Sequence, residues 1–151
     1  MTEVLFYHLQ NMSLESVLPP LLEKSLERGW RVVVQSTSPE RADALDAHLW
    51  TYSDDSFLPH AVWSVGDAPD QPIILAVEET NPNRANVRFL IDNAALPADC
   101  DSYERVVLVF NGDDDDALTA ARGAWADCKA RGFELTYWQA DERGRDRKSV
   151  V

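Results

Sequence analysis

Arg105-Val-Val-Leu-Val-Phe110 has no polar break after its first residue, which predicts a buried strand. Asn111-Gly-Asp113 then turns the chain, and a segment with helical spacing runs to about Arg131, with Gly132 as its C-terminal cap. Phe133-Glu-Leu-Thr-Tyr-Trp138 predicts the final strand. This succession of strand, helix and strand indicates an α/β domain whose sheet is largely parallel.

The first fifty residues show the same alternation. Pro19 and Pro20 fall inside the first helical segment, so they fit best in its first turns, or the helix kinks there. Ser38-Pro39-Glu40 marks the start of the second helix. The predicted elements are a strand over 4–9, a helix from 13 to 29, a strand over 31–36 and a helix over 39–50.

The middle of the chain has strands without intervening helices, at residues 61–64, 72–77 and 87–91. Such neighbours suggest antiparallel additions to the sheet. We therefore expect a single Rossmann-like domain over residues 1–140, with a mixed, mostly parallel sheet flanked by helices. Residues 141–151 are charged and without periodicity, which predicts a disordered tail.

The charge is distributed unevenly along the chain. Residues 1–121 carry 7 Lys/Arg against 21 Asp/Glu, whereas residues 122–151 carry 7 against 5, and the net charge is −12. The cations near the C-terminus are interleaved with aromatic residues, which indicates a small positive site on a negative body. Such a site suits an acidic peptide better than a long polyanion such as nucleic acid.

Targeting signals are not evident in the sequence. No apolar run approaches the roughly 20 residues that a membrane-spanning helix needs. Met1-Thr2-Glu3 lacks the basic start of a signal peptide, so we expect a cytoplasmic protein that does not enter membranes. Cys100 and Cys128 match no redox or zinc spacing and are expected to be reduced thiols.

Signals for catalysis or cofactor binding are weak. Residues 10–14 follow the first strand without a glycine, and no phosphate-binding glycine motif occurs, which argues against a nucleotide cofactor. The acidic run 113–116 fits a helix cap better than a metal site. His8, His48 and His60 have no ligand or catalytic motif beside them. We expect no catalytic, cofactor or metal site. The alternative is a small-molecule enzyme that uses the C-terminal edge of the sheet, which a deep pocket with His8 or His60 would favour.

Two groups of residues are candidates for protein binding. Trp50, Tyr52 and Phe57 cluster around the end of the second helix, as core aromatics or as a binding surface.

The other candidate surface is on the last helix. Arg122 and Lys129 are seven residues apart, so they lie on nearly the same side, beside Trp125, and Arg131 follows. A positive rim next to an aromatic ring is a socket for a carboxylate that adjoins an apolar side chain. The alternative is a solvated helix face whose cations favour the C-terminal end.

Several motifs resemble the chi subunit family of bacterial DNA polymerase III. They are Val4-Leu-Phe-Tyr-His-Leu9, Leu49-Trp50 followed by Ser56-Phe57-Leu-Pro-His60, Val109-Phe-Asn-Gly-Asp-Asp114, Ala120-Ala-Arg-Gly-Ala-Trp125 and Gly132-Phe-Glu-Leu-Thr-Tyr-Trp-Gln139. The resemblance covers nearly the whole chain except the tail.

The resemblance implies a non-enzymatic accessory protein of the clamp loader. Its expected partners are the psi subunit and the C-terminal tail of single-stranded DNA-binding protein, which is acidic and ends in Pro-Phe. By position, Arg122 and Trp125 match the family's tail-binding cation and aromatic, while Trp50 and Phe57 match the psi side. The family usually has Lys after the helix aromatic, where this chain has Ala126, so either Lys129 or Arg131 substitutes or the affinity for the tail is lower. Direct nucleic-acid binding by the basic tail is a third hypothesis, which the net charge disfavours.

Overall fold

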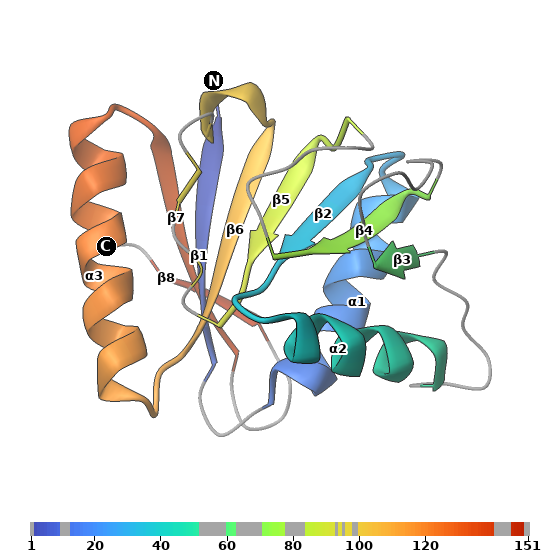
Figure 1. Cartoon of the computed structure of the whole chain (residues 1–151). Helices are drawn as coiled ribbons and strands as arrows, with labels where there is room; N and C mark the ends of the chain where they lie inside the picture. Colours follow the sequence, from blue (N-terminus) through green and yellow to red (C-terminus); the bar gives the residue numbers. More distant parts are fainter. Residues whose placement is uncertain are drawn as a thin grey trace.

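The computed structural model describes residues 2–9, 13–51, 60–62, 71–77, 84–92, 94, 96–97, 100–140 and 146–149 (Figure 1). In this part of the chain, eight strands form one sheet in the order β3-β4-β2-β5-β6-β1-β7-β8. The strands are β1 (Glu3–Leu9), β2 (Val32–Gln35), β3 (His60–Val62), β4 (Ile73–Ala76), β5 (Val87–Leu90), β6 (Arg105–Asn111), β7 (Glu134–Ala140) and β8 (Asp146–Ser149). The helices are α1 (Leu14–Glu27), α2 (Pro39–Thr51), α3 (Asp115–Ala130) and the short 3₁₀ helix η1 (Cys100–Ser102).

The two faces of the sheet hold separate apolar clusters. Alternate residues of β1 divide between them, because successive side chains of a strand point to opposite faces. Leu5 and Tyr7 pack with α1 and α2, whereas Val4 and Phe6 pack with α3. Figure 1 shows α3 covering one end of the sheet, apart from α1 and α2. The expected α/β, Rossmann-like architecture is confirmed.

The prediction of antiparallel strands in the middle of the chain was wrong. β4 and β5 both run parallel to β2, and β3 runs parallel to β4. Parallel neighbours need a crossover connection, usually a helix, and the segments that connect β3 to β4 and β4 to β5 lie mostly outside the described residues. Every residue of β2, β4 and β5 is buried, which is typical of strands covered on both faces.

The antiparallel strand lies at the C-terminus. Residues 146–149, which we expected to be disordered, form β8 and pair with β7 from Tyr137↔Ser149 to Ala140↔Asp146. The prediction was therefore wrong for these four residues. Pairing gives the backbone groups on the outer side of β7 hydrogen-bond partners, and a short charged strand is a common way to end a sheet.

The start of α1 depends on a contact with α2. Ser13 caps the helix by accepting from the Ser16 amide, and Pro19 and Pro20 both fall inside the helix. Proline has no N–H, so Pro19 cannot donate to the carbonyl of Glu15 four residues earlier. His48 Nε2 of α2 lies 2.7 Å from that carbonyl oxygen and donates to it. The imidazole thus replaces the missing helical hydrogen bond and ties the two helices together.

Replacing His48 with alanine should lower the free energy of unfolding by about 1 kcal/mol, because the Glu15 carbonyl loses its donor. In a Pro19→Ala background the restored amide can donate instead, so the same substitution should cost less. Urea unfolding of the four proteins of this double-mutant cycle measures the coupling. Additive effects would mean that His48 does not compensate for Pro19.

A buried arginine makes hydrogen bonds across the sheet. Arg88 of β5 is 0% exposed. Its Nε and Nη2 donate to Gln35 Oε1 of β2 at 2.9 and 2.6 Å, and its Nη1 donates to the Tyr103 hydroxyl at 3.0 Å. These bonds connect two strands to the segment that leads into β6.

Candidate binding groove beside the last helix

A hollow of about 570 Å³ lies between α3 and strands β1, β6 and β7. We call it the α3 groove. It is lined by Phe6, His8, Phe110, Leu118, Ala121, Arg122, Trp125 and Tyr137. Apart from His8 and Arg122 these side chains are apolar or aromatic, so the groove is an apolar surface with few polar groups, which is the usual composition of a ligand site.

The position of α3 is fixed at its N-terminus. Asp114 is the N-cap, and its Oδ1 accepts from the amides of Asp116 and Ala117 at 2.9 and 3.3 Å. Asp115 and Asp116 occupy the first turn, where negative charge complements the helix dipole. The acidic run therefore caps the helix, as its sequence predicted. Among the described residues, no cluster of His, Cys, Asp or Glu has the geometry to hold a metal ion.

Arg122 and Trp125, two residues of the candidate surface on the last helix, both line the groove. They lie three residues apart on α3. The ring of Trp125 packs edge-on against Phe6, with centroids 5.0 Å apart. Arg122 is exposed, and within the described part of the chain no carboxylate pairs with it. A guanidinium with open N–H donors therefore stands beside an aromatic wall.

Lys129 and Arg131 do not line the groove. Lys129 is exposed and follows Trp125 by one helical turn on the same face. Arg131 lies past the end of α3, where its guanidinium is 3.7 Å from Asp127 and 4.9 Å from the centre of the Phe133 ring. Arg131 is thus partly neutralised by a neighbouring acid, and of the two only Lys129 lies on the helix face that carries Trp125.

The floor of the groove contains a histidine that the sequence did not link to this site. The hydroxyl of Tyr137 and the Nδ1 of His8 form a hydrogen bond, and the His8 ring lies 5.0 Å from that of Phe110. A Cβ at Gly112 would clash with the imidazole of His8, so this position admits only glycine unless the imidazole moves. The side chain of His8 is therefore confined between Phe110, Tyr137 and the turn at Gly112.

Burial lowers the pKa of His8 below its ordinary value of 6.5, and the nearby charge of Asp113 only partly opposes this. The unfolded chain thus takes up a proton before the folded protein does as the pH falls through about 6.5. As the pH falls from about 6.5 towards the pKa of His8 in the folded protein, the stability that neutral His8 contributes is progressively lost. We expect the urea midpoint to fall between pH 7 and pH 5, and to fall less in His8→Leu. Equal slopes for both proteins would contradict this assignment.

The second predicted surface is only partly described. Trp50 at the end of α2 is 49% exposed, and its ring lies 4.2 Å from that of the buried His60. His60 Nε2 is 3.2 Å from a carboxylate oxygen of Asp46. Tyr52 and Phe57 lie outside the described residues. Among the described residues, Trp50 is the only large apolar residue with an exposed side chain.

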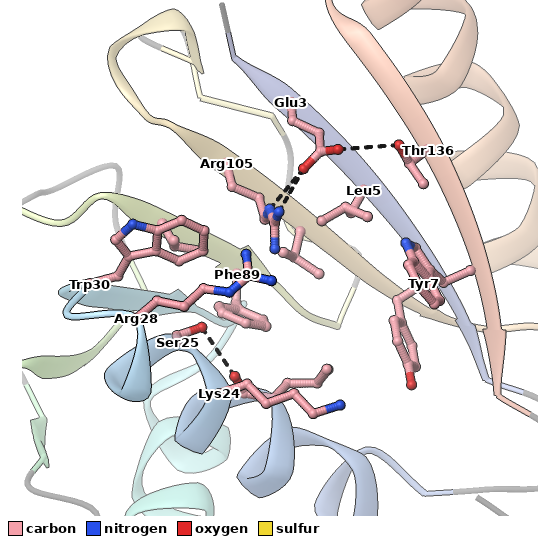
Figure 2. Close-up of a pocket in the computed structure, with 14 residues that line it drawn as sticks. Glu3, Leu5, Tyr7, Lys24, Ser25, Arg28, Trp30, Phe89, Arg105 and Thr136 are labelled. Carbon is pink, nitrogen blue, oxygen red and sulfur yellow. Dashed lines mark hydrogen bonds and ion pairs between the residues drawn. The ribbon is translucent and has the colours of Figure 1, made fainter. Parts of the chain in front are cut away.

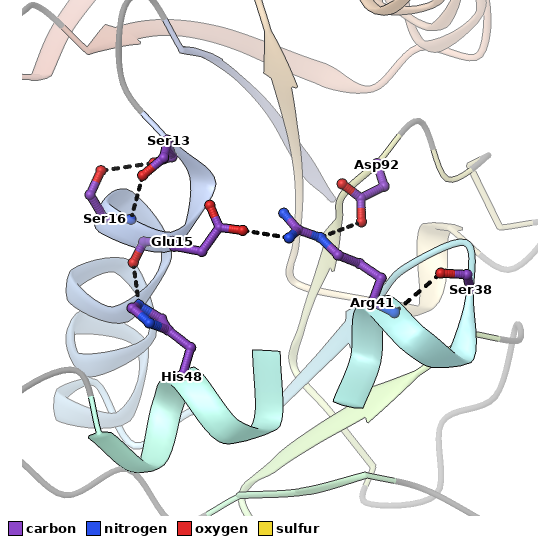
Figure 3. Close-up of polar contacts among 7 residues, drawn as sticks. All are labelled: Ser13, Glu15, Ser16, Ser38, Arg41, His48 and Asp92. Atoms are coloured by element: carbon purple, nitrogen blue, oxygen red, sulfur yellow. Dashed lines mark hydrogen bonds and ion pairs between the residues drawn. The ribbon is translucent and has the colours of Figure 1, made fainter. Parts of the chain in front are cut away.

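Ion pairs lie at the C-terminal edge of the sheet (Figure 3). This edge is where enzymes with such a fold bind their ligands. Arg41 donates from Nε to Asp92 at 2.8 Å and from Nη1 to Glu15. The pKa of Arg41 is raised, since the effects of these two acids exceed that of its burial, and the pKa of Glu15 is lowered. These side chains are engaged with one another and link α1, α2 and the end of β5.

The aromatic lining of the α3 groove was the part of the site that sequence reasoning missed. Phe6, His8 and Tyr137 come from strands that we had predicted, and Phe6 pairs in register with Tyr137. The signal was available in the alternation of β1, which assigns Phe6 and His8 to the same face. What the sequence could not supply was the strand order that places β1 between β6 and β7.

Comparison with known proteins agrees with the resemblance. A family model described as the DNA polymerase III chi subunit, HolC, matches residues 1–136. A relative from Rickettsia prowazekii (strain Madrid E), named probable DNA polymerase III subunit chi, is 31% identical over 91 residues. The match covers 60% of this chain and 55% of that protein, so the chain spans about half the length of the curated relative. No helix in the described residues has the length and apolar character to cross a membrane.

Proposed function

This chain belongs to the DNA polymerase III chi subunit family, and we propose that it is a non-catalytic accessory subunit of the clamp-loader complex. In this role it binds the acidic C-terminal tail of single-stranded DNA-binding protein in the α3 groove. It acts in the cytoplasm as a protein adaptor, without a cofactor or metal of its own and without direct contact with nucleic acid.

The observation that carries the proposal is the pairing of Arg122 with Trp125 over one apolar hollow. A tail of the kind expected for this family, acidic and ending in Pro-Phe, presents a terminal carboxylate beside a phenyl ring. Arg122 binds the carboxylate through its N–H donors. The phenyl ring packs between Trp125 and Phe110, where aromatic contacts favour offset or edge-on geometry.

Charge outside the groove assists the encounter. Lys129 lies one turn beyond Trp125 and attracts the aspartates that precede the terminal residue. Arg131 contributes less, because Asp127 and Phe133 already engage it. Since these side chains are exposed, their attraction acts over about 8–10 Å and weakens with added salt.

The surface at Trp50 is proposed to bind the psi subunit where one is present. A half-exposed tryptophan whose ring packs against His60 offers the large, rigid contact area that is typical of binding hot spots. Tyr52 and Phe57 are proposed as its companions in this contact. The Trp50 surface and the α3 groove involve different helices, so both partners can bind at once.

The proposal is tested by titrating the protein against a fluorescent peptide that copies the acidic tail. We expect saturable binding with a Kd of micromolar order, as a short peptide in a shallow groove gives. Amidating the C-terminus removes the charge that Arg122 binds, and replacing the last Phe with Ala removes the ring; each change should weaken binding at least about tenfold. No binding at high micromolar protein would refute the proposal.

Introducing the lysine that the family usually has should strengthen this binding. Ala126 is exposed and adjoins Trp125 on α3, so Ala126→Lys adds a cation beside the groove at little cost to folding. We expect the affinity for the tail peptide to rise about two- to fivefold at low salt, corresponding to about 0.5–1 kcal/mol for an exposed charge pair. Ala130→Lys, on the exposed part of the last turn, is the matched control and should change binding less.

A further inference from the structure

The α3 groove holds a second hydrogen-bond donor besides Arg122. The hydroxyl of Tyr137 reaches Nδ1 of His8, and both side chains line the groove. A phenolic hydroxyl has one donor and two acceptor positions, and within the described residues its hydrogen bond with His8 uses only one of them. The hydroxyl can therefore make a further hydrogen bond with a ligand in the groove.

The direction of α3 places Arg122 over the end of the groove where this hydroxyl lies. β6 and β7 both run parallel to β1, and α3 leads from the end of β6 to the start of β7, so the helix runs against the strands. Trp125 packs against Phe6, and Arg122 precedes Trp125 by one helical turn, about 4.5 Å along the helix axis. Arg122 is therefore displaced from Phe6 towards the carboxyl ends of the strands, the direction in which His8 follows Phe6 on β1.

The Tyr137 side chain extends in this same direction. In register, Tyr137 lies opposite Phe6, whereas its hydroxyl contacts His8, further along β1. The guanidinium of Arg122 and the hydroxyl of Tyr137 thus lie at the same end of the groove, and the rings of Phe6 and Trp125 lie beyond them. Two donors at one end of an apolar hollow are the arrangement that a carboxylate attached to an apolar group requires.

His8 holds the hydroxyl in position. The Nε2 side of its ring lies against the turn at Gly112, so Nδ1 is the nitrogen that faces Tyr137. When Nδ1 carries the proton of the neutral ring, it donates to the Tyr137 oxygen and leaves the phenolic O–H free to donate to a ligand. An anionic ligand favours this arrangement, because the O–H group then stabilises its charge.

We propose that Tyr137 is the second hydrogen-bond donor to the terminal carboxylate of the tail peptide, and that His8 is the positioning residue behind it. Arg122 and the Tyr137 hydroxyl each bind one carboxylate oxygen, while the phenyl ring of the terminal residue packs against Trp125. The groove is thereby selective for a C-terminal phenylalanine, whose carboxylate adjoins its own ring. This inference rests on the proposed function, since it names the residues that recognise the carboxylate in the same groove.

The same contact links peptide binding to the protonation of His8. Among the described residues, three groups that carry or can carry a charge surround its imidazole: Tyr137 on β7, Asp113 in the turn after β6, and Arg122 on α3. In the free protein, burial lowers the pKa of His8 below 6.5, and Asp113 only partly opposes this. A carboxylate bound at Tyr137 stabilises the imidazolium, so the pKa of His8 is higher in the complex and binding takes up protons. The carboxylates of the peptide, with ordinary pKa values of about 3.3–3.9, stay ionised above pH 5. Affinity should therefore rise as the pH falls from 7 to 5.5.

The test is a cycle of two proteins and two tail peptides, with a free or an amidated C-terminus, measured by fluorescence anisotropy. Tyr137→Phe keeps the ring and removes only the hydroxyl, so it should weaken the free-acid peptide about tenfold and the amidated peptide about twofold or less. Tyr7→Phe is the matched control and should change the binding of neither peptide. Tyr7 and Arg28 line a separate hollow of about 310 Å³ beside α1, on the opposite face of the sheet (Figure 2).

A pH profile tests the role of His8. Wild type should bind the free-acid peptide at least about twofold more tightly at pH 5.5 than at pH 7. His8→Leu, with its fold checked by circular dichroism, should lose most of this dependence, and Tyr137→Phe, which keeps the imidazole, should reduce it. Equal weakening of both peptides by Tyr137→Phe, or a pH profile that both variants leave unchanged, would overturn the inference and leave the proposed function standing. An absence of binding by wild type would overturn both.

Discussion

Replacing Arg88 with alanine should lower the free energy of unfolding by about 3–5 kcal/mol. The side chain is wholly buried, and it satisfies the amide oxygen of Gln35 and the hydroxyl of Tyr103. Alanine leaves a cavity in place of most of the arginine side chain and removes the hydrogen bonds that both polar groups accept from Arg88. Urea unfolding followed by circular dichroism measures the loss.

Two variants separate the cavity from the lost hydrogen bonds. Arg88→Met fills most of the volume but leaves Gln35 without its donor, so it should cost about 1–3 kcal/mol. Adding Gln35→Leu removes the unsatisfied amide and should recover part of that loss, because an apolar replacement of a buried polar pair is often tolerated. A loss below about 1 kcal/mol for Arg88→Ala would show that the buried guanidinium does not stabilise the sheet.

Reversing the charge of Arg122 should reduce affinity for the acidic tail by on the order of 100-fold or more. Arg122→Glu removes a charge-assisted hydrogen bond worth about 1.5–3 kcal/mol and places a carboxylate against the terminal carboxylate of the peptide. Folding should be unaffected, since Arg122 is exposed. The measurement is fluorescence anisotropy with the labelled tail peptide.

Arg28→Glu is the matched control, because it makes the same change in net charge on the opposite face of the sheet. Its affinity for the tail should stay within about twofold of wild type, as distant exposed charges are screened. If both variants weakened binding equally, the peptide would be responding to the overall charge of the protein, and Arg122 would have no specific role.

Much of the fold could be predicted from local sequence signals. Helix starts were marked by Ser13 and Pro39, and helix ends by Gly29 and Gly132, both of which adopt positive φ. The middle strands were predicted to be antiparallel because no helical pattern separates them in the sequence. Ile73-Ile-Leu-Ala76 is apolar without alternation, which is typical of a parallel strand and could have corrected this.

Long-range features were beyond local signals. The buried Arg88 sits in an otherwise apolar strand, and nothing near it in sequence identifies Gln35 as its partner across the sheet. Likewise, Arg122 and Trp125 were found from their helical spacing, but the groove they line depends on β1 and β7. The hollow beside α1 was missed because Glu3, Arg28 and Arg105, which line it, come from three separate parts of the chain.

The position of the bound tail peptide can be found by ¹H–¹⁵N NMR of the labelled protein. If the tail binds beside α3, the largest shifts fall on the lining of the α3 groove, at Phe6, His8, Arg122, Trp125 and Tyr137, with small shifts elsewhere. Saturable binding whose shifts instead gather around Trp50, or around Arg28 on the opposite face of the sheet, would contradict binding in the α3 groove.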